Sequence, residues 1–271
     1  MHLPMPVEHY ENFPVASWLL PRHLREAVSA LYAFARSADD IADEGDLSTE
    51  ERLQQLDRYR RELGKIASAS PVHDPIFLRL ARTIASHDLP LQPFFDLLDA
   101  FSQDAVKTRY ADFAELMDYC RRSANPVGRL LLRLYRAENP AQLAWSDSIC
   151  SSLQLINHWQ DIGVDWNKGR VYLPQEDLLR FGVSESQIAE GRIDDNWKSL
   201  LLFHVDRARA MMLAGAPLGR NLPGRIGLEL RLIVAGGLRI LEKIEAVDYD
   251  IFHQRPQLKS VDWPLLLWRG I

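Results

Sequence analysis

Apolar residues recur at helical spacing through most of this chain, and this pattern constrains the fold more than any other feature. Leu24, Val28, Leu31 and Ala35 fall on one face of a helix that is expected to begin near Pro21. Alternating runs bounded by Asn-Gly or Asp-Gly turns, which are typical of β-hairpins, do not occur. Because no repeat or linker interrupts the pattern, residues 1–271 predict one all-α helical bundle.

The charge balance limits the partners that the chain can bind. The formal net charge is −5, whereas nucleic-acid binding needs clustered Lys and Arg to neutralise phosphates, so we expect no nucleic-acid partner. An anionic substrate would need a local device, such as bound metal ions.

The cysteines and the termini indicate where the protein works. Cys120 and Cys150 fit neither a disulfide framework nor a zinc pattern, which favours a reducing, cytoplasmic compartment. We find no signal peptide and no apolar stretch of the roughly 18 to 20 residues that a membrane span needs. The apolar, aromatic tail 261–269 either packs on the core or rests on a membrane surface, and in the second case the protein is peripheral at the inner face of the membrane.

A first acidic pair stands near the end of the helix that follows Pro21. Asp39 and Asp43 are four positions apart, which places them on one helix face about 5 to 6 Å apart at Cβ. Two like charges near a helix C-terminus are unfavourable, and a bound cation would offset that cost. Mg²⁺ suits such a pair, because it takes one or two carboxylates and completes its shell with water and phosphate. The alternative is a solvated acidic helix end.

A second acidic pair repeats the spacing in the segment 154–165. Asp161 and Asp165 share a face with Asn157 and Gln154, and apolar residues flank this polar stripe. Buried polar side chains without partners are costly, so the stripe indicates a cavity or an ion rather than a surface, although a polar surface stripe stays the alternative. Arg170 follows in a short loop, where a guanidinium can bind two phosphate oxygens at once.

The two pairs together predict more than either one alone. Two helices with Asp-x-x-x-Asp facing each other across a bundle would form a cage of four carboxylates. Such a cage could hold a cluster of Mg²⁺ ions and, through them, a diphosphate. Metal ions held in this way would supply the local positive charge that an acidic protein needs to bind an anionic substrate.

Three motifs resemble those of the squalene/phytoene synthase family, and the resemblance covers the chain from about Asn12 to near Arg255. The most specific motif is Gln154-x-x-Asn157-x-x-x-Asp161-x-x-x-Asp165, followed by Arg170-x-Tyr172-x-Pro174. The other two are Tyr32-x-x-x-Arg36-x-x-Asp39-x-x-x-Asp43 and the stretch from Tyr119 to Gly128.

The resemblance implies an isoprenoid-synthase helical bundle with a central cavity and Mg²⁺ as cofactor. It implies metal ligands and a second set of residues that hold diphosphate or order the site. The metal ligands would be Asp39, Asp43, Asn157, Asp161 and Asp165. The second set would be Tyr32, Arg36, Gln154, Arg170 and Tyr172.

The opening segment 11–17, the run 35–46 and Ser123-Ala124-Asn125-Pro126 resemble the hydroxysqualene synthase branch of hopanoid biosynthesis. That branch implies conversion of presqualene diphosphate and water to hydroxysqualene, with release of diphosphate and contact with other enzymes of the pathway. Gln160 and Asn125 are polar candidates to guide the water. Two alternatives stay open: head-to-head condensation of prenyl diphosphates such as farnesyl diphosphate, and a non-catalytic helical scaffold.

Overall fold

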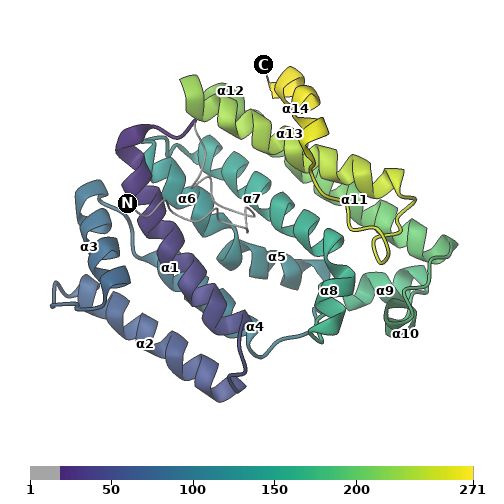
Figure 1. Ribbon diagram of the computed structural model, residues 1–271, viewed down its shortest axis with the longest axis horizontal. Helices are drawn as coiled ribbons and strands as arrows, with labels where there is room; N and C mark the ends of the chain where they lie inside the picture. Colours follow the sequence, from purple (N-terminus) through teal and green to yellow (C-terminus); the bar gives the residue numbers. More distant parts are fainter. Residues whose placement is uncertain (1–18, 271) are drawn as a thin grey trace.

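The computed structural model describes residues 19–270, and within them the chain folds into helices without a β-strand (Figure 1). An isolated bridge pairs Arg109 with Val171. The first half contains η1 (Arg22–Leu24), α1 (Arg25–Asp43), α2 (Thr49–Ala67), α3 (Pro75–His87), α4 (Gln92–Asp104), α5 (Phe113–Ser123) and α6 (Asn125–Leu134). The second half contains α7 (Pro140–Gln160), α8 (Ile162–Asn167), α9 (Gln175–Phe181), α10 (Glu185–Ala189), α11 (Asp195–Gly215), α12 (Leu218–Asn221), α13 (Gly224–Ala246), η2 (Ser260–Asp262) and α14 (Trp263–Gly270).

Local capping explains where several of these helices begin. Ser48 and Glu51 form a reciprocal capping box at the start of α2. Asp112 caps α5 by accepting from the Glu115 N–H, and Asn139 caps α7. Each cap satisfies backbone N–H groups that a helix start leaves without partners, so the sequence itself fixes these boundaries.

Two clusters of buried apolar side chains hold the bundle together. One joins α1, α2, α3, α4 and α6 around Phe34, Phe77 and Phe94, and Phe34 meets each of the other two rings edge to face. The other surrounds α7, α11 and α13 and includes the fully buried Trp159 and Trp197. The helices that carry the two acidic pairs therefore belong to different clusters, and tertiary packing has to bring the pairs together.

The C-terminal tail forms a short helix rather than an unstructured end. Leu266 of α14 is buried, and Gly270 lies against Leu232 of α13. Trp263 and Trp268 remain exposed, so the tail packs on the bundle by one face only. No helix among residues 19–270 has the length and apolar character to cross a membrane.

Candidate active site

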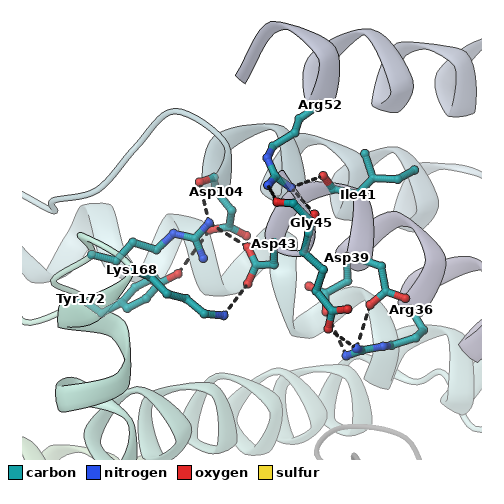
Figure 2. A network of polar contacts seen from close by, with 12 residues as sticks. Arg36, Asp39, Ile41, Asp43, Gly45, Arg52, Asp104, Lys168 and Tyr172 are labelled. Carbon is teal, nitrogen blue, oxygen red and sulfur yellow. Dashed lines mark hydrogen bonds and ion pairs between the residues drawn. The ribbon is translucent and has the colours of Figure 1, made fainter. Parts of the chain in front are cut away.

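The first acidic pair lies on the last turn of α1. Arg36, one turn earlier, pairs with Asp40 at 2.8 Å and with Glu44 at 2.7 Å, and it lies 3.6 Å from Asp39. Figure 2 shows Arg36 on one side of Asp39 and Asp43, while Lys168 and Tyr172 approach from the other side. The spacing of four residues thus holds Arg36 and both aspartates together, as expected from the helix period.

A guanidinium from α2 fixes the end of α1. Arg52 donates from Nη1 to the carbonyl oxygens of Ile41 at 2.7 Å and Glu44 at 2.9 Å, and from Nη2 to that of Gly45 at 2.7 Å (Figure 2). The last carbonyls of a helix have no partners within it, and a cation there also opposes the negative end of the helix dipole. Arg52 therefore stabilises the turn that carries Asp43.

The loop after α8 reaches across to the first pair. Arg170 Nη2 lies 2.7 Å from Asp43 Oδ1 and also donates to the Asp104 carbonyl oxygen at 3.0 Å. Lys168 Nζ lies 3.8 Å from Asp43 Oδ2. The motif that contains the second pair therefore supplies the cations that neutralise the first, although more than 120 residues separate Asp43 from Arg170.

The second pair spans a junction between two helices, whereas the sequence pattern predicts one continuous helix. α7 ends at Gln160, and Asp161 has φ −107° and ψ 12°. The Asp161 N–H still donates to the Asn157 carbonyl at 3.0 Å, and the Asp165 N–H donates to the Asp161 carbonyl at 2.8 Å. The helical spacing is therefore kept, and Asn157, Asp161 and Asp165 stay successive residues of one ladder.

Contacts from the C-terminal segment coincide with this junction. Arg255 grips both carboxylate oxygens of Asp161, with Nη2 3.0 Å from Oδ2 and Nε on Oδ1. Gln160 donates from Nε2 to the Pro256 carbonyl at 2.6 Å. Gln160 and Asp161, which are adjacent at the end of α7, therefore both contact residues 255–256. Helical periodicity in the sequence could not predict this contact.

One carboxyl of each pair has a strongly raised pKa. Burial, followed by the charge of Asp43, raises the pKa of Asp39 to about 7. Burial, followed by the charge of Asp161, raises the pKa of Asp165 to about 7, and Asp43 adds a smaller contribution. Two carboxylates that lie close together repel each other, and a divalent cation bound between them would offset that repulsion.

The residues of the two pairs therefore fit Mg²⁺ in the chemistry of their oxygen donors. Within the described residues, no group of three or more His, Cys, Asp or Glu side chains is arranged to hold a metal ion. The fit thus depends on two-carboxylate sites, in which water and phosphate oxygens complete the coordination shell.

A buried carboxyl next to the first pair is absent from the sequence prediction. Asp104 accepts from the Tyr119 hydroxyl at 2.9 Å, and the Tyr172 hydroxyl lies 3.5 Å from its other oxygen. Burial raises the pKa of Asp104 to about 8 despite the nearby charge of Arg170. One signal was available, because Asp104 extends the buried stripe of α4 that contains Leu97 and Phe101.

His158 is packed against aromatic and polar neighbours of the site. Its ring stacks on Tyr172 with centroids 3.7 Å apart, and Gln154 Nε2 lies 3.3 Å from its Nε2. Burial, together with the charge of Arg170, lowers the pKa of His158 to about 3, so the ring is neutral near pH 7. Gln154 and Tyr172 are thus joined through one neutral imidazole.

A cavity lies between α1, α4, α5, α6 and α7, next to the first pair. The charged and larger polar side chains of its lining are Tyr32, Arg36, Asp39, Tyr119 and Gln154. Its remaining lining is largely apolar: Ala35, Leu97, Phe101, Ser123, Ala124, Val127, Cys150 and Leu153. A lining that combines charged side chains with hydrocarbon suits a ligand that carries both an anionic group and an apolar chain.

The two residues suggested as guides for water do not line this cavity. Gln160 is committed to the Pro256 carbonyl, and the Asn125 side-chain oxygen accepts from the Ser151 hydroxyl at 2.8 Å. Both side chains are buried and bonded to other partners, which does not favour their role as guides for water. The sequence shows that Gln160 and Asn125 are polar and lie in motifs, but it does not show the direction of their side chains.

Comparison with known proteins identifies the family. Residues 7–262 match the family model of squalene/phytoene synthases. The chain belongs to the squalene/phytoene synthase family. It is therefore an enzyme of this family, and the predicted all-α isoprenoid-synthase fold is confirmed.

Relatives within the family carry different names. A hydroxysqualene synthase of Rhodopseudomonas palustris is 36% identical over 256 residues, which cover 93% of this chain and 85% of that protein. A 15-cis-phytoene synthase of Synechococcus elongatus is 30% identical over 259 residues, with 90% and 83% covered. The crystal structure of squalene synthase HpnC from Alicyclobacillus acidocaldarius is 38% identical, with a TM-score of 0.82 and coverage of 89% of this chain and 90% of that chain.

Proposed function

We propose that this enzyme converts presqualene diphosphate and water to hydroxysqualene and diphosphate, with Mg²⁺ as cofactor. One observation carries the proposal: Arg170 and Lys168, from the loop after the second acidic pair, neutralise Asp43 of the first pair, and Asp39 of that pair lines a largely apolar cavity. The hydroxysqualene synthase relative supports the choice of this reaction within the family.

The metal ligands in this proposal come from both pairs. Asp39 and Asp43 would hold Mg²⁺ from α1, and Asp161, Asp165 and Asn157 would hold it from the α7–α8 junction. Bound Mg²⁺ would act as a Lewis acid that stabilises the negative charge on the departing diphosphate. The bound cation would also offset the repulsion between the two carboxylates of each pair.

The chain's own cations and hydroxyl groups order the site. Arg36 and Arg170 would donate charge-assisted hydrogen bonds to phosphate oxygens, which are stronger than neutral ones. Tyr32 and Gln154 line the same cavity as Arg36. Tyr172 helps to order the site, since its ring stacks on His158 and its hydroxyl lies near Asp104.

The apolar lining has a separate task. When the carbon–oxygen bond to diphosphate breaks, its electron pair leaves with diphosphate and a carbocation remains. Leu97, Phe101 and Leu153 exclude bulk water around that cation. One admitted water then adds its oxygen to the cation, and the resulting oxonium gives its proton to the released diphosphate, which leaves the alcohol.

Substitution of one aspartate in each pair tests the proposal. Asp43→Asn and Asp161→Asn should each lower turnover of presqualene diphosphate with Mg²⁺ by at least about a hundredfold. Asp147→Asn is the matched control, because Asp147 also lies on α7 and pairs with an arginine, Arg129, outside the cavity lining. Near-native turnover by either site variant would reject the metal-cage mechanism.

Head-to-head condensation is the second candidate, favoured by the phytoene synthase relative. The product separates the two reactions. The purified protein is incubated with Mg²⁺ and presqualene diphosphate without NADPH, and in parallel with farnesyl diphosphate. Hydroxysqualene from the first incubation supports the proposal, whereas accumulation of presqualene diphosphate from the second, with no product from the first, supports condensation.

We also propose that α14 rests on the cytoplasmic surface of a membrane. Trp268 is 77% exposed and Trp263 53% exposed, and Val261 and Leu267 are exposed beside them. Tryptophan favours the membrane interface, where its ring meets both apolar and polar surroundings. The native chain should co-sediment with anionic liposomes more strongly than a Trp263→Ser, Trp268→Ser variant, and equal binding would refute this part of the proposal.

A further inference from the structure

The segment 250–259 belongs to the connection from α13 to α14 (Figure 1), and its residues contact Gln160 and Asp161 at the α7–α8 junction. We name it the C-terminal strap. Its first part is anchored in the core: Ile251 is buried, and the Phe252 ring packs against Trp197 with centroids 4.7 Å apart. The Phe252 ring also lies near Gly163 of α8, where an added Cβ would meet it at 3.6 Å, an ordinary van der Waals distance. The strap is therefore attached beside the second acidic pair.

The later part of the strap is held by its backbone. Gln160, which is 8% exposed, donates to the Pro256 carbonyl at 2.6 Å. Lys243 of α13 donates to the Gln257 carbonyl at 2.8 Å. These two donors fix the carbonyls just after Arg255, and the anchored Phe252 lies three residues before it. The direction of the Arg255 side chain is thus set from both sides.

In this position Arg255 binds the carboxylate of Asp161, which is one of the proposed metal ligands. Its guanidinium forms a two-point contact with Asp161, through Nη2–Oδ2 at 3.0 Å and through Nε on Oδ1. A guanidinium on both oxygens and a metal ion at about 2.0 to 2.1 Å from the same carboxylate compete for the same lone pairs. The Arg255 guanidinium and a metal ion therefore cannot both make all of their contacts with the Asp161 carboxylate.

We propose that Arg255 is a displaceable counter-ion that neutralises Asp161 in the metal-free enzyme and lowers the affinity of the second acidic pair for divalent cations. This proposal rests on the proposed function, because it needs the second pair to bind metal. Gln160 is the positioning residue, since its hydrogen bond to the Pro256 carbonyl holds the C-terminal strap beside Asp161. Arg255 and Asp161 are 35% and 20% exposed, so the ion pair is partly screened by water and weak enough for a divalent cation to displace.

Manganese binding tests this proposal without reference to turnover. Mn²⁺ stands in for Mg²⁺ and is titrated by electron paramagnetic resonance, with pyrophosphate present, in an Asp39→Asn, Asp43→Asn background that leaves only the second pair. Arg255→Gln should bind Mn²⁺ about tenfold more tightly than this background. Arg255→Lys, which keeps the charge but loses the two-point contact, should fall between them.

A matched control removes the general effect of one positive charge. Arg129 contacts both oxygens of Asp147 in the same geometry, at 3.0 and 2.6 Å, and Asp147 lies fourteen residues before Asp161, about 21 Å along α7. Arg129→Gln should therefore leave the Mn²⁺ affinity unchanged. Gln160→Met should tighten binding in the same direction as Arg255→Gln but less.

The outcomes separate this proposal from the proposed function. Equal affinity of Arg255→Gln and the background would overturn the role of Arg255 while the metal site stands. Equal tightening by Arg255→Gln and Arg129→Gln would also overturn it, since only long-range charge would then matter. No Mn²⁺ binding by the native chain would overturn the metal site and this proposal with it.

Discussion

The first acidic pair lies on one uninterrupted helix, whereas the second spans a junction between two. The end of α1 is fixed locally, by Arg36 on the same helix and by Arg52, eleven residues after Ile41. The junction at Asp161 is fixed by Arg255, 94 residues further along the chain. The difference teaches that one half of the site is arranged by local sequence and the other by the closure of the whole fold.

The positively charged side chains around the two acidic pairs show the same difference between the two halves of the site. Arg170 and Lys168 join the two halves, since they follow the second pair in sequence and contact Asp43 of the first. The first pair is therefore neutralised from two sides, while Asp161 depends on the C-terminal strap. Substitutions that remove one cation at a time can test this asymmetry.

The largest effect is expected at Arg170, whose side chain is only 12% exposed. Arg170→Met leaves Asp43 and the Asp104 carbonyl without their donor, and the free energy of unfolding should fall by about 3 kcal/mol. Chemical denaturation measures this change. Arg129→Met, which breaks an exposed pair, should cost at most about 1 kcal/mol. Equal losses in the two variants would show that Arg170 does not join the halves.

A smaller effect is expected at Arg52. Arg52→Ala removes the donor to three carbonyls at the end of α1, and the free energy of unfolding should fall by about 1 to 2 kcal/mol. Hydrogen exchange should become faster in residues 41–47 and stay unchanged at the α7–α8 junction. Faster exchange at both places would mean that the two halves are not fixed independently.

Measured per pH unit, the smallest effect is the pH dependence that Asp104 contributes beside the first pair. Its pKa is raised to about 8 in the folded protein from an ordinary value near 4. Between these values the folded state binds the extra proton, so this group contributes stability at low pH that is lost as pH rises, by about 1 kcal/mol per pH unit.

Asp104→Asn isolates this contribution, because the amide oxygen can still accept from Tyr119. The variant should lose less stability than the native chain between pH 5 and pH 8, as measured by urea unfolding at each pH. An identical pH slope in the two proteins would show that Asp104 is ionised in the fold.

Much of the fold follows from local sequence. The helical spacing, Pro21, Gly45 and the capping residues Ser48 and Asp112 predict the boundaries of α1, α2 and α5 to within a few residues. The short helices α9, α10 and α14 are less predictable, because a few residues carry little periodicity and tertiary packing decides whether they form. The expected opening motif at residues 11–17 lies outside the described residues.

The candidate site is predictable where its residues act through local spacing. Asp39, Asp43 and Arg36 lie together because the helix period places them so, and Gln154 reaches the cavity from α7 for the same reason. Arg255 could not be found in this way, since only the folded chain brings it to Asp161. The roles of the ten predicted site residues stay predictions until metal and substrate binding are measured.

The central claim is that two distant carboxylate pairs bind shared divalent ions that hold diphosphate. Anomalous diffraction from crystals grown with Mn²⁺ and pyrophosphate tests it most directly. We expect manganese peaks at Asp39 and Asp43 and at Asp161 and Asp165, bridged by pyrophosphate, with Arg255 moved off Asp161. Manganese absent from either pair, with pyrophosphate bound elsewhere, would contradict the claim.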